Sequence, residues 1–242
     1  MLTETKLKYE VAELKDKKLP VIIVAAGNST RMGTNKQFMR ISGLPVIART
    51  LAAFENADII DRIILVVKAD DIFSFEILVK KYGFQKVTDI VSGGNTRAES
   101  VQKGIERLAF NDTRVLIHDG ARPLVSERII NSVANALKVH QAVSCAVKVK
   151  DTIKQVDKNG KIIRTLDRES LYAMQTPQGV RVSDYLEAIS KIGNVSAFYD
   201  DTSIMEAANY DCYCVEGSYK NIKITTPDDI EAAESYLKEE DL

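Results

Sequence analysis

The sequence has few residues of the kinds that build disulfide frameworks or structural metal sites: its 242 residues include no tryptophan, three cysteines and two histidines. So few thiols and imidazoles do not indicate a disulfide scaffold or a zinc centre. Cys212 and Cys214 alternate with Tyr213 in a strand-like run, which predicts buried strand thiols rather than a metal-binding pair. This cysteine usage favours a cytoplasmic protein.

Long hydrophobic runs and an excess of charge of one sign are also missing. No apolar stretch approaches the length of a membrane span, and the first residues lack the apolar region of a signal peptide. A net charge of −1 argues against general nucleic-acid binding. We therefore expect no membrane and no nucleic acid as partners, and basic groups with a function only in loops.

Hydrophobic residues, in contrast, make up 45% of the chain, which is enough for the core of one large domain. Residues 1–19 mix charged side chains with isolated apolar ones and predict a polar N-terminal extension. We place the single domain at residues 20–242.

Strand-like and helix-like segments alternate along most of this domain. The order predicts an α/β fold, a mainly parallel twisted sheet with helices on both faces. Ligands of such sheets bind beyond the carboxyl ends of the strands, where we expect the polar motifs to converge. The expected strands are 21–25, 62–67, 87–91, 115–118, 142–147 and 212–215, and the expected helices are 45–54, 72–82 and 183–192, with further helices from 96, 126, 201 and 226.

The alternation changes at residues 148–166. Apolar and polar residues alternate on both sides of Asp157-Lys158-Asn159-Gly160, which predicts a β-hairpin with Asn159-Gly160 as the turn pair. A hairpin inserted into an α/β chain cannot bury both of its faces alone. It therefore either covers the site as a flap or reaches another subunit.

The first expected strand ends in a loop of small residues followed by two cations. Ala26 and Gly27 allow a polyphosphate to approach backbone N–H groups. Arg31 and Lys36 bring the positive charge that phosphoryl or nucleotidyl transfer requires. The loop matches neither the dinucleotide fingerprint nor the P-loop. It predicts a nucleoside triphosphate site, and the alternative is an ordinary strand-to-helix connection with surface cations.

Two adjacent glycines, Gly93 and Gly94, precede the helix expected from residue 96. Thr96 and Glu99 fit a capping box, which is the purely structural interpretation. The glycines do more than a cap requires, because they allow close approach of a flat base. Main-chain groups and Ser100 could then bind the edge of that base.

Three later segments carry further charged residues. Asp119, at a strand end, can bind a divalent metal or a ribose hydroxyl, and Arg122 can clamp a phosphate; the alternative is a turn aspartate with a surface arginine. Thr176-Pro177 by itself indicates a turn. Residues 226–229 form a strong helix N-cap, which leaves Lys223 unexplained and available to the site.

The ordered set of motifs resembles one family. Ala-Ala-Gly…Arg-Met…Lys-Gln, Gly-Gly-x-x-Arg-x-x-Ser, His-Asp-x-Ala-Arg-Pro, Asp-Thr-Ile-Lys, Thr-Pro-Gln and Asn-Ile-Lys-Ile-Thr-x-Pro-Asp-Asp follow one another from Val21 to the C-terminus. Together they resemble the 2-C-methyl-D-erythritol 4-phosphate cytidylyltransferases, nucleotidyltransferases of the non-mevalonate isoprenoid pathway with a Rossmann-like fold. The resemblance implies transfer of CMP from CTP to that polyol phosphate, Mg²⁺ as cofactor, and a homodimer joined by a hairpin arm at about 148–170.

Matching positions imply roles for individual residues, with Thr152 and Arg168 acting in the neighbouring subunit's site. Gly120 and Tyr199 stand where the family often has Ala and Thr. The implied catalytic residues are Arg31, Lys36, Arg168 and Lys223; the nucleotide-binding residues are Ala25, Ala26, Gly27, Gly93, Gly94, Asn95, Ser100 and Asp119; the substrate-binding residues are Arg122, Thr152, Arg168, Thr176 and Lys223; and Asp119 is the metal ligand.

The resemblance also implies a mechanism without a general base. The substrate phosphate is an anion at pH 7, so one of its oxygens attacks the α-phosphorus of CTP directly. Two alternatives remain at this point. Ribitol-5-phosphate cytidylyltransferase is a sister enzyme with the same nucleotide loop, and a non-catalytic nucleotide-binding module would lack a need for the cations.

Overall fold

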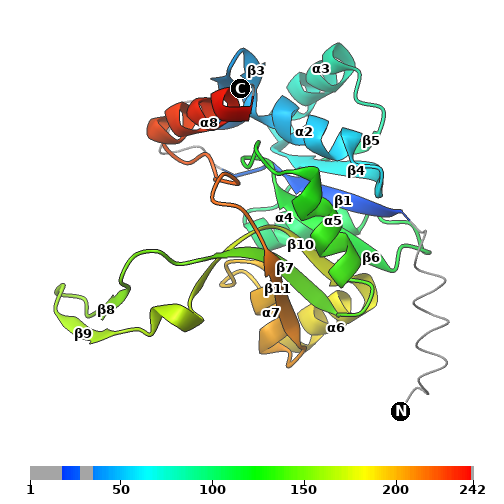
Figure 1. Cartoon of the computed structure of the whole chain (residues 1–242). Coiled ribbons are helices and arrows are strands. Elements are labelled where there is room, and N and C mark those ends of the chain that lie inside the picture. The colour runs from blue at the N-terminus through cyan, green and yellow to red at the C-terminus, as the bar shows by residue number, and fades with distance from the viewer. Residues whose placement is uncertain (1–17, 28–34, 241–242) are drawn as a thin grey trace.

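The computed structural model describes residues 18–27 and 35–240, which form an α/β fold around one seven-stranded sheet (Figure 1). The strand order is β11-β7-β10-β6-β1-β4-β5. β10 is antiparallel to both of its neighbours, whereas the other pairs are parallel. The strands are β1 (Leu19–Val24), β4 (Ile60–Val67), β5 (Val87–Ser92), β6 (Arg114–Asp119), β7 (Ala142–Lys148), β10 (Tyr172–Arg181) and β11 (Cys212–Glu216).

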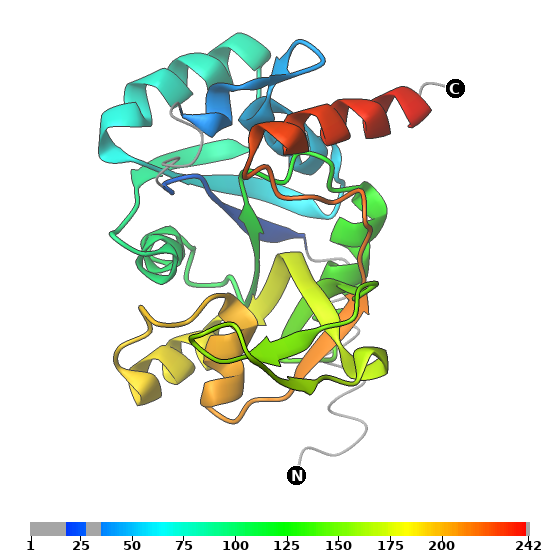
Figure 2. The same cartoon turned by 90° about the vertical axis from the view of Figure 1, so that its left-hand side faces the viewer.

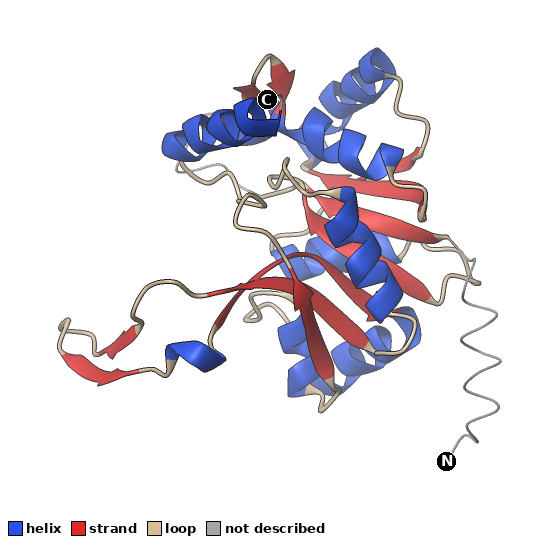
Figure 3. Cartoon of the chain, in the orientation of Figure 1, coloured by secondary structure: helices blue, strands red, loops and turns tan. Residues whose placement is uncertain are grey.

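Helices cover both faces of this sheet (Figures 2 and 3). Successive residues of β1 point to opposite faces, so Val21 and Ile23 belong to one buried core and Ile22 to the other. α2, α3 and α5 pack on the first core, and α4, α6 and α7 pack on the second. The helices are α2 (Val46–Asn56), α3 (Ile72–Tyr82), α4 (Arg97–Ile105), α5 (Glu127–Ala136), α6 (Val182–Ile192), α7 (Asp201–Ala207) and α8 (Pro227–Glu240).

Shorter elements complete the fold: η1 (Lys36–Phe38), η2 (Ala69–Asp71), η3 (Arg168–Ser170) and a small hairpin of β2 (Arg40–Ile41) and β3 (Leu44–Pro45). Within the described ranges, no helix combines the length and hydropathy needed to cross a bilayer. The polar extension predicted at residues 1–19 lies almost wholly outside the described residues.

The predicted hairpin is present as β8 (Lys154–Val156) and β9 (Ile162–Thr165), an arm that projects from the body of the protein (Figure 1). Its turn is longer than the predicted Asn-Gly pair, because Val156 pairs with Ile162 across a loop of the residues between them. The Asp157 carboxylate accepts the N–H groups of Asn159 and Lys161, and Gly160 has a φ of +83°. The carboxylate and the glycine together set this wider turn.

Two expectations from the sequence are wrong. Thr176-Pro177 is not a turn but lies inside β10, where the pairing with β7 shifts register between Met174 and Gln178. The proline, which has no N–H, falls in this interruption of the ladder. The prediction that Cys212 and Cys214 are buried is also wrong, because Cys212 is half-buried and Cys214 is exposed.

Candidate active site

A cleft of about 410 Å³ lies beyond the carboxyl ends of β1, β4, β5 and β6. The motifs that follow these strands therefore do converge at one edge of the sheet. Ala25 is buried beneath the cleft, and Arg31 lies outside the described residues. The predicted residues that line the cleft are Ala26, Gly27, Lys36, Gly93, Gly94, Asn95, Ser100, Asp119 and Lys223.

Gly93 brings two of these loops into close contact. Its N–H donates to the Val67 carbonyl at 2.8 Å, which holds the loop after β5 against the end of β4. A Cβ at Gly93 would lie 2.5 Å from the Ala26 Cβ and 2.7 Å from the Ser100 Oγ, so a side chain there would push the loops apart. The glycine is thus required by packing as well as by any ligand.

The loop before α4 is fixed by its own hydrogen bonds. The Thr96 hydroxyl accepts the Glu99 N–H at 3.1 Å, as a capping box predicts. The Glu99 carboxylate, however, accepts the Asn95 N–H rather than that of Thr96. The Ser100 hydroxyl accepts the Gly94 N–H and donates to the Thr96 carbonyl. Ser100 therefore shapes the loop that faces the cleft.

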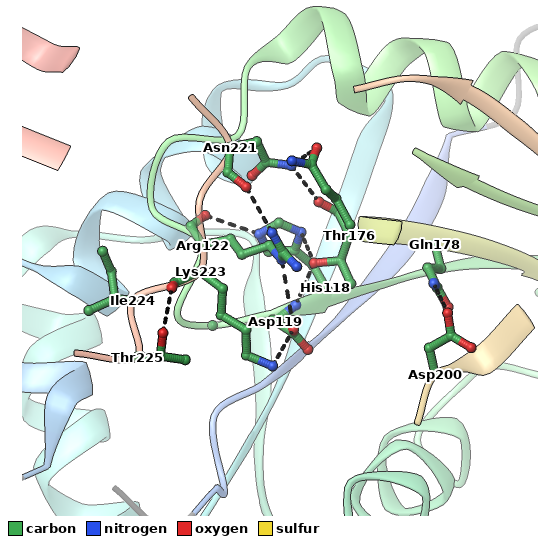
Figure 4. Close-up of polar contacts among 12 residues, drawn as sticks. His118, Asp119, Arg122, Thr176, Gln178, Asp200, Asn221, Lys223, Ile224 and Thr225 are labelled. Carbon is green, nitrogen blue, oxygen red and sulfur yellow. Dashed lines mark hydrogen bonds and ion pairs between the residues drawn. The ribbon is translucent and has the colours of Figure 1, made fainter. Parts of the chain in front are cut away.

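Asp119 lies among three cationic side chains, two of which, Arg122 and Lys223, are labelled in Figure 4. Its Oδ1 is 3.1 Å from the Arg97 Nε, and its Oδ2 is 2.8 Å from the Lys223 Nζ and 3.8 Å from the Arg122 Nε. Burial alone would raise the pKa of Asp119, but the three cations hold it well below its usual range. Asp119 is therefore an anion with both oxygens engaged.

A buried polar chain fixes the backbone on either side of Asp119 (Figure 4). The Asp119 N–H donates to the Thr176 hydroxyl at 3.0 Å, and that hydroxyl lies 3.0 Å from the His118 Nδ1. The His118 Nε2 lies 3.2 Å from the Arg122 carbonyl. A proton on Nε2 satisfies both contacts, so His118 joins the two ends of the turn and the Thr176 hydroxyl is already in use.

His118 should make the protein sensitive to mild acid. Burial lowers the pKa of His118 to about 3, so below pH 6.5 the unfolded chain takes up a proton that the folded chain does not. The contribution of neutral His118 to the free energy of unfolding is therefore full above pH 6.5 and is lost as the pH falls from there toward 3. Between pH 7 and pH 5, the free energy of unfolding should fall by about 2 kcal/mol.

Urea unfolding of the wild type, His118→Gln and His140→Gln at pH 7 and pH 5 measures this effect. We expect His118→Gln, which replaces one of the chain's two histidines, to lose the pH dependence between these points, and His140→Gln to keep it. Equal pH dependence in all three proteins would show that another group titrates.

The segment before α8 carries Lys223 and also binds the side chain of Lys36. Lys36 starts η1, where the Asn35 side chain accepts the Gln37 N–H, and its Nζ donates to the Ile224 carbonyl at 2.9 Å. The neighbouring Lys223 reaches Asp119. The segment between β11 and α8 therefore places both ammonium groups at the cleft, Lys223 as one of its own residues and Lys36 through the Ile224 carbonyl.

The arm residues lie apart from this cleft. Thr152 and Arg168 do not line it, and the arm extends away from the body of the chain (Figure 1). The Arg168 Nη1 donates to the Lys150 carbonyl at 2.9 Å, within the arm itself. The described part of one chain thus brings most of the predicted body residues to the cleft. Arg122 and Thr176 lie beside Asp119 without lining the cleft, and the arm residues lie apart from it.

Three residues of the site were missed from the sequence. Arg97 pairs with Asp119 and with Asp201, which is fully buried at the start of α7, and Lys68 lines the cleft at the end of β4. Arg97 stands inside the quoted Gly-Gly-x-x-Arg-x-x-Ser motif, which was a usable signal. Asp201 follows the N-cap residue Asp200 and could not be told from a capping residue.

The described residues supply few ligands for a metal. They contain no group of three or more His, Cys, Asp or Glu side chains placed to hold an ion. Asp119 is one carboxylate, and Mg²⁺ binds in many sites through one or two carboxylates plus substrate phosphates. The donor set fits an ion carried mainly by a polyphosphate rather than a protein cage.

Comparisons with known proteins point to one family. The family model for 2-C-methyl-D-erythritol 4-phosphate cytidylyltransferase matches residues 19–239. A protein of that name from Clostridium novyi is 45% identical over 222 residues, which are 90% of this chain and 95% of the relative. The crystal structure of 4-diphosphocytidyl-2C-methyl-D-erythritol synthase from Anaerococcus prevotii superposes with a TM-score of 0.83 at 33% identity, over 94% of this chain and 99% of that one.

Proposed function

This chain belongs to the 2-C-methyl-D-erythritol 4-phosphate cytidylyltransferase family, and on that premise we propose that its cleft transfers CMP from CTP to 2-C-methyl-D-erythritol 4-phosphate. The observation that carries the proposal is the convergence of Lys36, Lys223 and Arg97 at the strand ends beside Asp119. Phosphate-rich substrates need such a concentration of positive charge. The family names the substrate pair, and no observation favours ribitol 5-phosphate.

The proposed reaction is a direct displacement. An oxygen of the substrate phosphate forms a bond to the α-phosphorus of CTP, the bond from that phosphorus to the bridging oxygen breaks, and pyrophosphate leaves with the electron pair. No proton has to be removed first. The protein has to align two anions that repel each other and to stabilise charge at the α-phosphorus.

Each group of residues has a part in that task. The glycine loop at Gly93 and Gly94 holds the base, and the small residues after β1 hold the triphosphate together with Arg31 and Lys36. Lys223 and Arg122 hold the sugar phosphate. Mg²⁺, with Asp119 as its protein ligand, would neutralise phosphate charge when bound.

We further propose a two-fold homodimer joined by the arm. Val156, Ile162 and Ile163 are 52%, 58% and 58% exposed in one chain, an apolar surface that a partner would cover. A hollow of about 610 Å³ at the root of the arm, lined in part by Tyr172 and Tyr219, is a surface on which a partner's arm can pack. We also place the enzyme in the cytoplasm, where its free thiols are stable.

A substrate survey tests the function. The wild type is incubated with Mg²⁺, one of CTP, ATP or GTP, and either polyol phosphate, and pyrophosphate release is measured. We expect kcat/KM for CTP to exceed that for a purine nucleotide by about a hundredfold or more, because a site that pairs one base rejects another strongly. Comparable kcat/KM with a purine triphosphate, or preference for ribitol 5-phosphate, would overturn the proposed specificity.

A further inference from the structure

A buried chain of charged groups connects the cleft to α7. Arg97 lies between two carboxylates, with its Nε 3.1 Å from the Asp119 Oδ1 and its Nη2 2.8 Å from the Asp201 Oδ2. The Asp201 side chain is 0% exposed, and its Oδ1 accepts a hydrogen bond of 2.9 Å from the Tyr185 hydroxyl. If Arg97 moved away, it would leave a fully buried carboxylate without a counter-ion, which is costly. Arg97 is therefore held in place.

Lys223 pairs with the same Asp119 in a different setting. Its Nζ lies 2.8 Å from the Asp119 Oδ2, but its side chain is 40% exposed and faces the cleft. It extends from a segment between β11 and α8 that forms neither helix nor strand. An exposed ammonium on such a segment can exchange a carboxylate for a phosphate. Of the two described cations that lie within 3.1 Å of the Asp119 carboxylate, Arg97 is thus fixed and Lys223 is exchangeable.

We infer that Arg97 is a positioning residue whose fixed charge neutralises Asp119, so that Lys223 can leave this carboxylate for the phosphates of the bound substrates. The inference rests on the proposed function. Without Arg97, Arg122, at 3.8 Å, is the one cationic side chain of the described residues that stays beside the carboxylate when Lys223 moves away. Asp119 would then hold Lys223 more strongly, and less of the lysine would reach the reacting phosphates.

A double-mutant cycle tests this coupling. Arg97→Gln with Asp201→Asn removes the buried charges as a pair and leaves two amides in their place. We expect this pair of changes to lower kcat about ten- to hundredfold, while KM for CTP changes less than about threefold, because the released lysine acts in the transition state. In a Lys223→Ala background the same pair should change kcat by less than about threefold.

A second ion pair supplies the matched control. Arg62 pairs with Asp112 far from the cleft, with side-chain exposures of 24% and 7% against 22% and 0% for Arg97 and Asp201. Arg62→Gln with Asp112→Asn should leave kcat unchanged. The inference is wrong if the Arg97 and Asp201 changes do not lower kcat. It is also wrong if they lower kcat by the same factor in the Lys223→Ala background as in the wild type.

If the variant with both Arg97→Gln and Asp201→Asn does not fold, Arg97→Lys provides a second test of the inference. It retains the charge but not the two-sided geometry, so we expect kcat within about threefold of the wild type even where the melting temperature falls. A kcat loss of tenfold or more in a folded Arg97→Lys protein would indicate a structural role. Turnover of CTP by the wild type is measured in parallel, so failure of the proposed function is seen separately.

Discussion

Replacing Lys36 with alanine should lower kcat by about a hundredfold or more while the protein remains folded. The ammonium of Lys36 donates to the Ile224 carbonyl at 2.9 Å, at the edge of the cleft and next to Lys223. A lysine in this position has no part in either core of the sheet. In the proposed reaction, its charge stabilises the negative charge that develops as pyrophosphate leaves. Steady-state kinetics with CTP and the polyol phosphate measure the loss.

The control for this variant is Lys103→Ala on α4. Lys103 pairs with Glu106 on the surface, with its side chain 51% exposed, so its removal should leave both kcat and the melting temperature almost unchanged. Circular dichroism and a melting curve show whether each variant is folded. Near-normal kcat in folded Lys36→Ala would remove Lys36 from the catalytic residues.

The elements that the sequence predicted well are those with a strong hydrophobic period. The helix expected at 72–82 is α3 (Ile72–Tyr82), and the strand expected at 21–25 is β1 (Leu19–Val24), in which every residue except Val24 is buried. Thr96 caps α4 as predicted, because capping chemistry is local. Convergence of the motifs followed from a general property of parallel sheets, that strands of one direction end at one edge.

β10 could not be predicted in the same way, because three of its six buried residues are polar. Gln175, Thr176 and Gln178 are at most 7% exposed, and each is paired with groups distant in the sequence. The Gln178 side chain accepts the Asp201 N–H. It also donates to the Asp200 carboxylate, as Figure 4 shows. Hydrophobic periodicity does not indicate a strand whose buried side chains are polar and form hydrogen bonds with distant residues.

The pairing of Arg97 with Asp201 is invisible for a related reason. The two residues are 104 positions apart, and each belongs to a local motif that already explains it as part of a helix start. Only the three-dimensional structure shows that Arg97, at the start of α4, forms an ion pair with Asp201, at the start of α7. Site residues that act through long-range ion pairs thus need the structure, whereas those on strand-end loops do not.

Mixing two inactive variants should restore activity if the arm acts across the dimer. Lys36 lies at the cleft of its own chain, whereas Arg168 lies on the exposed arm and does not line that cleft. Lys36→Ala and Arg168→Ala should each be almost inactive alone. In a mixed dimer, one site lacks both residues and the other has both intact. Refolding an equal mixture of the two chains gives mixed dimers in about half of the population, so we expect about a quarter of wild-type activity.

The control for the mixing experiment uses two residues of the same cleft. Lys36 and Lys223 both line the cleft of one chain, so a mixture of Lys36→Ala and Lys223→Ala chains leaves every site with one defect and should recover no activity. Native mass spectrometry verifies that mixed dimers form. If mixed dimers of Lys36→Ala and Arg168→Ala are present and remain inactive, Arg168 acts in the site of its own chain or not at all, and the proposal that the arm serves the partner's site is wrong.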